Sequence, residues 1–117
     1  MEYALLLYGP TTGGPSPEEA AAEHPRWTAY TQELIDAGVH RGGQALQWLD
    51  TATTVRERGG ERLLSDGPFA ETKEALAGFY LIDVPDLDTA IEWAAKIPLV
   101  GRGSVEVRPI MNVGAAA

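Results

Sequence analysis

The segment Asp66–Glu74, which reads DGPFAETKE, places three carboxylates and one ammonium group beside the most apolar stretch of the chain. An Asp that precedes a turn commonly accepts a hydrogen bond from the backbone N–H two residues later. That residue is Pro68, which has no N–H. The Asp66 carboxylate is therefore either a structural cap that reaches farther along the loop, or a general base or hydrogen-bond acceptor for a ligand.

Histidine is the side chain whose ordinary pKa suits proton transfer near neutral pH. His24 falls early in a predicted helix, and it would pair with Asp66 as an acid/base unit if both side chains faced one cavity. The alternative is a histidine on the helix surface. His40, beside Arg41 and near a strand, has the weaker claim to a catalytic role.

Aromatic and acidic residues near predicted strand ends supply the candidate ligand-binding side chains. Trp48 follows a glycine-rich strand and is expected to be the most exposed tryptophan. Phe69 is either a core residue or a ligand contact, while the acidic residues of the motif line a cleft mouth, contact a partner or form a solvated cluster. These candidates are Tyr8, Trp48, Phe69, Glu71 and Glu74.

The residue types argue against a bound metal or cofactor. The chain has no cysteine, which excludes disulfides, thiolate nucleophiles and iron–sulfur clusters. Its two histidines and scattered carboxylates lack a recognisable metal-ligand spacing, and no glycine-rich phosphate loop is present. We therefore expect neither a metal site nor a cofactor.

Apolar runs, caps and turn residues predict an alternating order of strands and helices. The expected elements are a strand over 3–9, a helix from 16 or 17 to 37, a strand over 39–49, a hairpin over 53–65 that turns at 59–60, a strand over 75–84, a helix over 86–97 and a strand over 103–110. Two split β-α-β halves of this kind describe a ferredoxin-like α+β sandwich with an inserted hairpin. Residues 1–111 are expected to form one domain, followed by a flexible tail over 112–117.

The two helices differ in how clearly the sequence defines them. Ser16 and Glu19 have the spacing of a capping box, but Pro25 implies either a kink or a helix start near His24. The apolar stripe of the first helix is expected to comprise Trp27, Tyr30 and Leu34, flanked by Thr31 and Ile35. The inner stripe of the second is expected to comprise Leu87, Ala90, Ile91 and Ala94.

The two strands over 3–8 and 76–82 are apolar on both sides, which two helices on one face of a sheet cannot cover. The first places Tyr3, Leu5 and Leu7 opposite Ala4, Leu6 and Tyr8, and the second places Leu76, Tyr80 and Ile82 opposite Ala77, Phe79 and Leu81. Each exposed large apolar side chain would forgo about 1.5–3 kcal/mol of burial. A second copy of the chain is the simplest cover, and the inserted hairpin folded over the sheet is the alternative.

The charge of the chain limits its partners. Nine Lys and Arg against seventeen Asp and Glu give a formal net charge of −8. This balance argues against nucleic acid and against an anionic membrane surface, because both attract clustered positive charge. The start of the chain reads as a strand rather than a signal peptide, so a cytoplasmic location is expected.

The nine residues DGPFAETKE match the signature of the DGPFAETKE family, which belongs to the YCII-related group. The stretches YALLLYG, GFYLIDVPDLDTAIEWAAKIP and GSVEVRPIM also resemble this family, so the likeness runs from Tyr3 to Met111. The resemblance implies a ferredoxin-like subunit that forms a dimeric α/β barrel. It further implies a bacterial protein, and members often resemble products encoded beside sigma factors of the extracytoplasmic-function type.

The resemblance leaves the activity open. Relatives in the wider superfamily include isomerases, monooxygenases and dehydrochlorinases, and a His–Asp pair is implied as catalytic in YCII-type relatives, where His24 matches the His position. Three hypotheses therefore stand: a small-molecule binder or cofactor-free acid/base enzyme with a cleft near residues 66–74, a regulatory module that binds a sigma factor, and a dimeric scaffold without catalysis.

Overall fold

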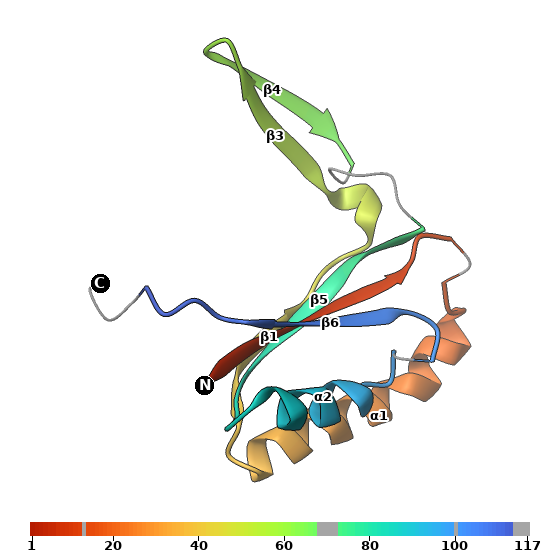
Figure 1. Ribbon diagram of the computed structural model, residues 1–117. Coiled ribbons are helices and arrows are strands. Elements are labelled where there is room, and N and C mark those ends of the chain that lie inside the picture. The colour runs from red at the N-terminus through yellow and green to blue at the C-terminus, as the bar shows by residue number, and fades with distance from the viewer. Residues whose placement is uncertain (13, 68–72, 100, 114–117) are drawn as a thin grey trace.

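The computed structural model describes residues 1–12, 14–67, 73–99 and 101–113 (Figure 1). It contains a four-stranded sheet, a two-stranded hairpin and two α-helices, which is an α+β protein as predicted. The elements in chain order are β1 (Glu2–Pro10), α1 (Pro17–Asp36), β2 (His40–Ala45), the short 3-10 helix η1 (Leu49–Thr51), β3 (Thr53–Arg58), β4 (Glu61–Asp66), β5 (Glu74–Asp83), α2 (Leu87–Ala95) and β6 (Ser104–Pro109).

The main sheet has the strand order β2-β5-β1-β6, and all of its neighbouring strands are antiparallel. Both helices lie against the same face of this sheet (Figure 1). The order is compatible with two interleaved β-α-β halves, the arrangement expected for a ferredoxin-like sandwich. Within the described residues, no helix is both long and apolar enough to cross a membrane.

Helix α1 begins at Pro17, so the alternative start near His24 is wrong. The backbone N–H of Glu19 donates to the Ser16 hydroxyl, and the Glu19 carboxylate accepts from the Ser16 N–H, which closes the predicted capping box. The helix continues through Pro25 to Asp36. The cap satisfies N–H groups at the helix start that would otherwise lack partners, which helps offset the one backbone hydrogen bond that proline removes.

The core lies between the helices and the inner face of the sheet. Residues at alternate positions of β1 point to this face, as the period of a strand requires, and they are buried with residues of both helices. Tyr30 is 2% exposed, and its hydroxyl donates to the Trp93 carbonyl oxygen at 2.9 Å, which links α1 to α2. The buried core residues are Tyr3, Leu5, Leu7, Tyr30, Leu34, Ile82, Val84, Ala90, Ala94, Ile97 and Leu99.

The helix stripes are narrower than the sequence predicts. Ile35 in α1 is 49% exposed, and Leu87 and Ile91 in α2 are 47% and 48% exposed. The small Ala90 and Ala94 instead carry the contact of α2 with the core. A short helix packed close through alanines leaves its flanking positions in solvent.

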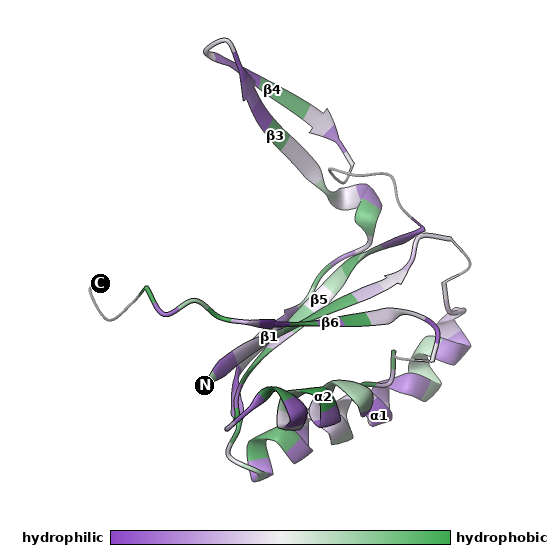
Figure 2. Ribbon diagram, viewed as in Figure 1, coloured by the Kyte–Doolittle hydropathy of each residue, from purple (hydrophilic) through white to green (hydrophobic). Residues whose placement is uncertain are grey.

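The outer face of the sheet carries apolar side chains that no helix covers. Leu6 pairs with Phe79, and Ala4 pairs with Leu81, so these side chains share this face. We call the set Ala4, Leu6, Tyr8, Leu76, Phe79 and Leu81 the open face. Figure 2 shows hydrophobic segments along β1 and β5 at the centre of the sheet. The two-sided apolar pattern predicted for these strands is therefore present, with one exception.

The exception is Leu76. Strict alternation along the strand predicts that Leu76 lies on the same side as Tyr80, which faces the helices. A register shift changes the pairing from Leu7 with Gly78 to Tyr8 with Leu76, and it leaves Ala77 as an extra residue in β5. A bulge of this kind reverses the side on which subsequent side chains lie. Leu76 therefore joins Tyr8 on the open face, and the prediction for Leu76 and Ala77 is wrong.

The inserted segment forms the predicted hairpin, with Gly59 and Gly60 at its turn in the positive-φ region that glycine tolerates. It projects away from the main sheet instead of folding over it (Figure 1). The hairpin-cover alternative is therefore wrong for a single chain. Val55 pairs with Leu64 across the hairpin, and both are more than 60% exposed.

Candidate functional site

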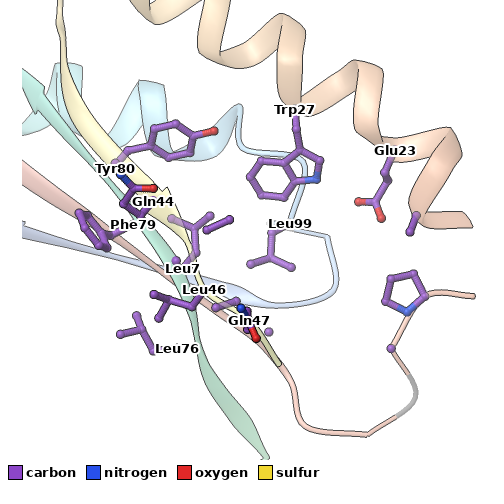
Figure 3. Close-up of a pocket in the computed structure, with 18 of the residues that line it drawn as sticks. Leu7, Glu23, Trp27, Gln44, Leu46, Gln47, Leu76, Phe79, Tyr80 and Leu99 are labelled. Carbon is purple, nitrogen blue, oxygen red and sulfur yellow. The ribbon is translucent and has the colours of Figure 1, made fainter. Parts of the chain in front are cut away.

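A cavity of about 900 Å³ lies between the first half of α1 and one end of the sheet (Figure 3). Its walls come from α1, from β1 and β5, from β2 and the segment that follows it, and from the loop after α2. Leu76 and Phe79 of the open face also belong to the lining. Most of its lining is apolar. The labelled residues in Figure 3 are Leu7, Glu23, Trp27, Gln44, Leu46, Gln47, Leu76, Phe79, Tyr80 and Leu99.

Helical spacing and small strand residues create this space. Glu23, Trp27 and Thr31 recur every four residues, so they share the face of α1 that lines the cavity. On the sheet side, Gly78 lies so close to β2 that an added Cβ would be 2.7 Å from the carbonyl oxygen of Gln44. Because Gly78 has no side chain, β5 and β2 approach closely here and no side chain at this position fills the cavity.

One end of the cavity carries a partly buried ion pair. The Oε1 atom of Glu23 lies 2.7 Å from the Nη1 atom of Arg102, and the Glu23 side chain is only 13% exposed. No described residue donates a well-aligned hydrogen bond to this oxygen, although the distance is short. The guanidinium therefore neutralises the charge of Glu23 without forming an aligned hydrogen bond to this oxygen.

The other end carries hydroxyl groups and an imidazole. The Thr31 and Tyr80 hydroxyls are 2.9 Å apart and share one hydrogen bond. The Tyr80 ring contacts Tyr30 edge to face at 5.3 Å and His40 at 6.5 Å between centroids. Burial raises the pKa of Tyr30 far above its ordinary value, with smaller contributions from Tyr80 and Glu33. Tyr30 therefore stays neutral and holds this end of the wall in place.

Trp48 lines the cavity and is also half exposed, as the sequence predicts. Its ring lies 3.6 Å from where a Cβ of Gly14 would stand, so it packs against the loop between β1 and α1. Trp27 faces the same space from α1. Two of the three tryptophans of the chain therefore contribute to one cavity.

The structure does not bring the predicted acid/base pair together within one chain. His24 lines the cavity. Asp66 is exposed at the end of β4, where it pairs with Thr53 in the projecting hairpin, and it is not part of the cavity wall. Of these two residues, His24 alone is placed to meet a molecule in the cavity.

The remaining candidates are dispersed. Tyr8 lies on the open face, because Leu7 beside it points inward, and its hydroxyl donates to the Glu106 carboxylate at 3.2 Å. Burial and this carboxylate raise the pKa of Tyr8. Glu74 accepts a hydrogen bond from the Ser104 hydroxyl at 2.7 Å. Phe69 and Glu71 lie outside the described residues.

The cleft predicted near residues 66–74 involves a segment, 68–72, that lies outside the described residues. The β5 part of the cavity wall begins at Ala75, immediately after the motif. Sequence reasoning missed Glu23 and Arg102. A signal for Glu23 exists, since it lies four residues before Trp27 on a helix, but Arg102 comes from a loop with no pattern. The described residues contain no group of three or more His, Asp and Glu side chains that could hold a metal ion.

The fold and the site define an α+β protein with a ligand-sized cavity between its first helix and its sheet. The sequence profile of the YCII-related domain matches residues 1–113. The chain is also 39% identical over 114 residues to the uncharacterized protein R00369 of Rhizobium meliloti (strain 1021), a match that covers 94% of this chain and 92% of that protein. The chain belongs to the YCII-related family.

Proposed function

We propose that the protein binds a small molecule in the cavity beneath α1. The observation that carries this proposal is one space of about 900 Å³ whose lining is mostly apolar, with an ion pair at one end and hydroxyl groups at the other. Binding sites for small ligands commonly have this size and this division between apolar walls and a few polar groups. The polar ends would orient the ligand, and the apolar walls would supply most of the affinity.

The chemistry that such a site supports is cofactor-free proton transfer. His24 borders the cavity, and an imidazole can both donate and accept a proton, so it is the candidate general acid or base for an isomerisation or elimination. Glu23 precedes it in the sequence and also borders the cavity. Asp66 of the same chain takes no part in this version of the proposal.

Fluorescence of N-phenyl-1-naphthylamine, a neutral aromatic probe, tests the binding function. We expect saturable binding of one probe per chain, with energy transfer from the two cavity tryptophans. Trp27→Ala should weaken binding at least fivefold, since about 1–3 kcal/mol of stacking and burial is lost. Leu81→Ala on the open face should not. Absence of saturable binding, or equal effects of the two variants, would refute the proposal.

We also propose that the open face packs against a second copy of the chain, which would build the dimeric α/β barrel. The apolar open face and the polar residues beside it support this. Glu106 pairs with Leu6, and Arg108 pairs with Ala4, so both charged side chains share the open face. A twofold arrangement would let Glu106 of one copy meet Arg108 of the other.

A further inference from the structure

We propose that the cavity selects a neutral, planar molecule that presents an N–H or O–H group to Glu23. This inference rests on the proposed binding function and goes further, because it names the class of ligand. It is carried by three observations on the cavity wall: an acceptor oxygen without an aligned donor, a balanced pair of charges, and an indole opposite small and aliphatic side chains.

The first observation is the state of the Glu23 carboxylate. Its side chain is 13% exposed, and Figure 3 shows it projecting from α1 beside Trp27 into the cavity. Arg102 contacts Oε1 at 2.7 Å without hydrogen-bond alignment, and no other described residue donates to that oxygen. A carboxylate accepts about four hydrogen bonds in all. Oε1 itself is fully covered, so it is closed to a ligand. No described residue donates to the other oxygen, Oε2, and Glu23 therefore retains acceptor capacity there, which a donor on the ligand would use.

The second observation is the charge balance at this end. Glu23 and Arg102 are one anion and one cation in direct contact, so neither is available as an uncompensated counter-ion. A charged ligand would lose its hydration on entering the apolar cavity and would face one group of its own sign. A neutral donor loses far less hydration and gains a hydrogen bond to an ionised acceptor, which is stronger than one between neutral groups.

The third observation is the shape of the space. The Trp27 indole forms one wall, and Leu7 and Leu99 lie on the opposite side (Figure 3). Small residues form the neighbouring part of the sheet, where Gly43 and Gly78 leave no side chain. An aromatic ring fits between an indole and aliphatic side chains, and stacking on the indole favours a planar molecule.

Three related probes separate these ideas, and all are used with the full chain. N-phenyl-1-naphthylamine is neutral, has flat aromatic rings and carries one N–H. Its N-methyl derivative has the same rings without the donor. The 5-sulfonate of the parent compound keeps the donor free and adds a negative charge. We expect the N-methyl derivative to bind about tenfold more weakly than the parent, because the hydrogen bond to Glu23 is lost.

Charge variants test the role of the ion pair. In Glu23→Gln, the preference for the neutral parent over its sulfonate should fall about tenfold, since Arg102 then lacks its counter-ion. In Arg102→Gln, the same preference should rise, because Glu23 is left uncompensated. The matched control is Glu33→Gln, which removes a carboxylate of α1 that pairs with Lys96 in solvent and should leave the preference unchanged.

The outcomes distinguish the two proposals. If the parent probe does not bind, the proposed function itself fails. If the parent and N-methyl probes bind within threefold of each other, the binding function stands but the inference is overturned. The inference is equally overturned if neither charge variant changes the preference for the neutral probe. The probe comparison needs only the wild-type protein, so a variant that does not fold still leaves a decisive result.

Discussion

Individual side chains in this protein act mainly by joining elements that are distant in sequence. Tyr30 is the clearest case, because its hydroxyl is buried and bonds to the Trp93 carbonyl oxygen of α2. Glu23 and Arg102 join the first half of α1 to the loop after α2. Substituting these side chains therefore tests directly how the elements around the cavity pack together.

We expect Tyr30→Phe to lower the free energy of unfolding by about 1 kcal/mol at neutral pH, because the Trp93 carbonyl loses its partner. The same variant should also be less sensitive to alkali. Burial raises the pKa of Tyr30 in the folded chain, whereas the unfolded chain ionises near the ordinary value of 10.0. The stability that this group contributes is therefore complete below that pH and is lost as the pH rises above it.

Urea unfolding of wild type and Tyr30→Phe between about pH 8 and pH 11 measures both effects, and the two stability curves should converge at high pH. Parallel curves for wild type and Tyr30→Phe would contradict the assignment of a raised pKa to Tyr30.

Asp86 caps α2, and the stabilisation that this cap provides should decrease at low pH. Its carboxylate accepts from the Thr89 hydroxyl at 2.7 Å and from the Thr89 backbone N–H at 2.8 Å. These hydrogen bonds, the hydroxyl first, hold the pKa of Asp86 below its ordinary value of 3.8. The charged cap therefore stabilises the fold above that pH, and its contribution disappears as the pH falls toward the lower folded pKa.

Thermal melts at neutral pH and below about pH 4 check this expectation. Asp86→Ala should lower the Tm at neutral pH and make it less dependent on acid. Asp86→Asn keeps a capping side chain, so it should retain most of the neutral Tm while losing the acid dependence. Equal acid dependence in all three proteins would show that Asp86 does not carry the effect.

At the scale of the elements, the sequence predicts what depends on local pattern. The capping box at Ser16 and the turn at Gly59–Gly60 each satisfy a backbone requirement within a few residues, and both are present. The bulge at Ala77 was not predictable, because it arises from pairing with β1, more than sixty residues away. Continuous apolar runs also hide such a shift, since every residue suits either face.

The candidate site divides in the same way. His24 and Trp48 were identified from residue type and local context, and both line the cavity. The partner of Glu23 is Arg102, which lies in the loop between α2 and β6 and meets α1 only in the folded chain. The predicted pair of His24 with Asp66 required both side chains to face one cavity, whereas β4 carries Asp66 out along the hairpin (Figure 1).

The contact between β2 and β5 offers an element-scale test. We expect Gly78→Ala to lower the free energy of unfolding by about 1–3 kcal/mol, because its Cβ would be 2.7 Å from the Gln44 carbonyl oxygen and 3.3 Å from the Ala45 Cα. Backbone atoms in a paired strand cannot move aside cheaply. Chemical denaturation measures this loss of stability. Fluorescence titration should also show weaker binding of the naphthylamine probe, since these strands form part of the cavity wall.

Gly101→Ala is the matched control. No atom outside its immediate chain neighbours lies within 4 Å of a Cβ added there, and its φ is not positive. The substitution should leave stability within about 0.5 kcal/mol of wild type, as surface changes generally do. If both alanine variants were equally stable, the close approach of β2 to β5 would be disproved.

At the scale of the whole molecule, the chain has two layers, the helices and the main sheet. The central strands are apolar on both sides, which is the pattern expected of a sheet covered on both faces. Helices cover the inner face of the sheet, and no helix covers the open face (Figure 1). The hairpin does not fill this gap, because it projects outward with Val55 and Leu64 exposed. The proposed second copy would supply this layer for both chains at once.

We therefore expect the protein to sediment at twice the mass of one chain at micromolar concentration. Leu6→Asp should shift it to the monomer, because a carboxylate at the centre of the open face would be buried without a partner in the dimer. In the monomer, that carboxylate faces water and leaves the core intact. Circular dichroism of Leu6→Asp should accordingly remain that of a folded α+β protein.

Leu87→Asp provides the control, since Leu87 is an equally large apolar residue that is 47% exposed on α2, across the sheet from the open face. It should leave the dimer unchanged. A wild-type monomer at micromolar concentration, or loss of the dimer in both variants alike, would refute packing through the open face. Selective loss in Leu6→Asp would mean that the second apolar side of β1 and β5 exists for assembly, which explains why two central strands tolerate a pattern that a solitary two-layer domain would not.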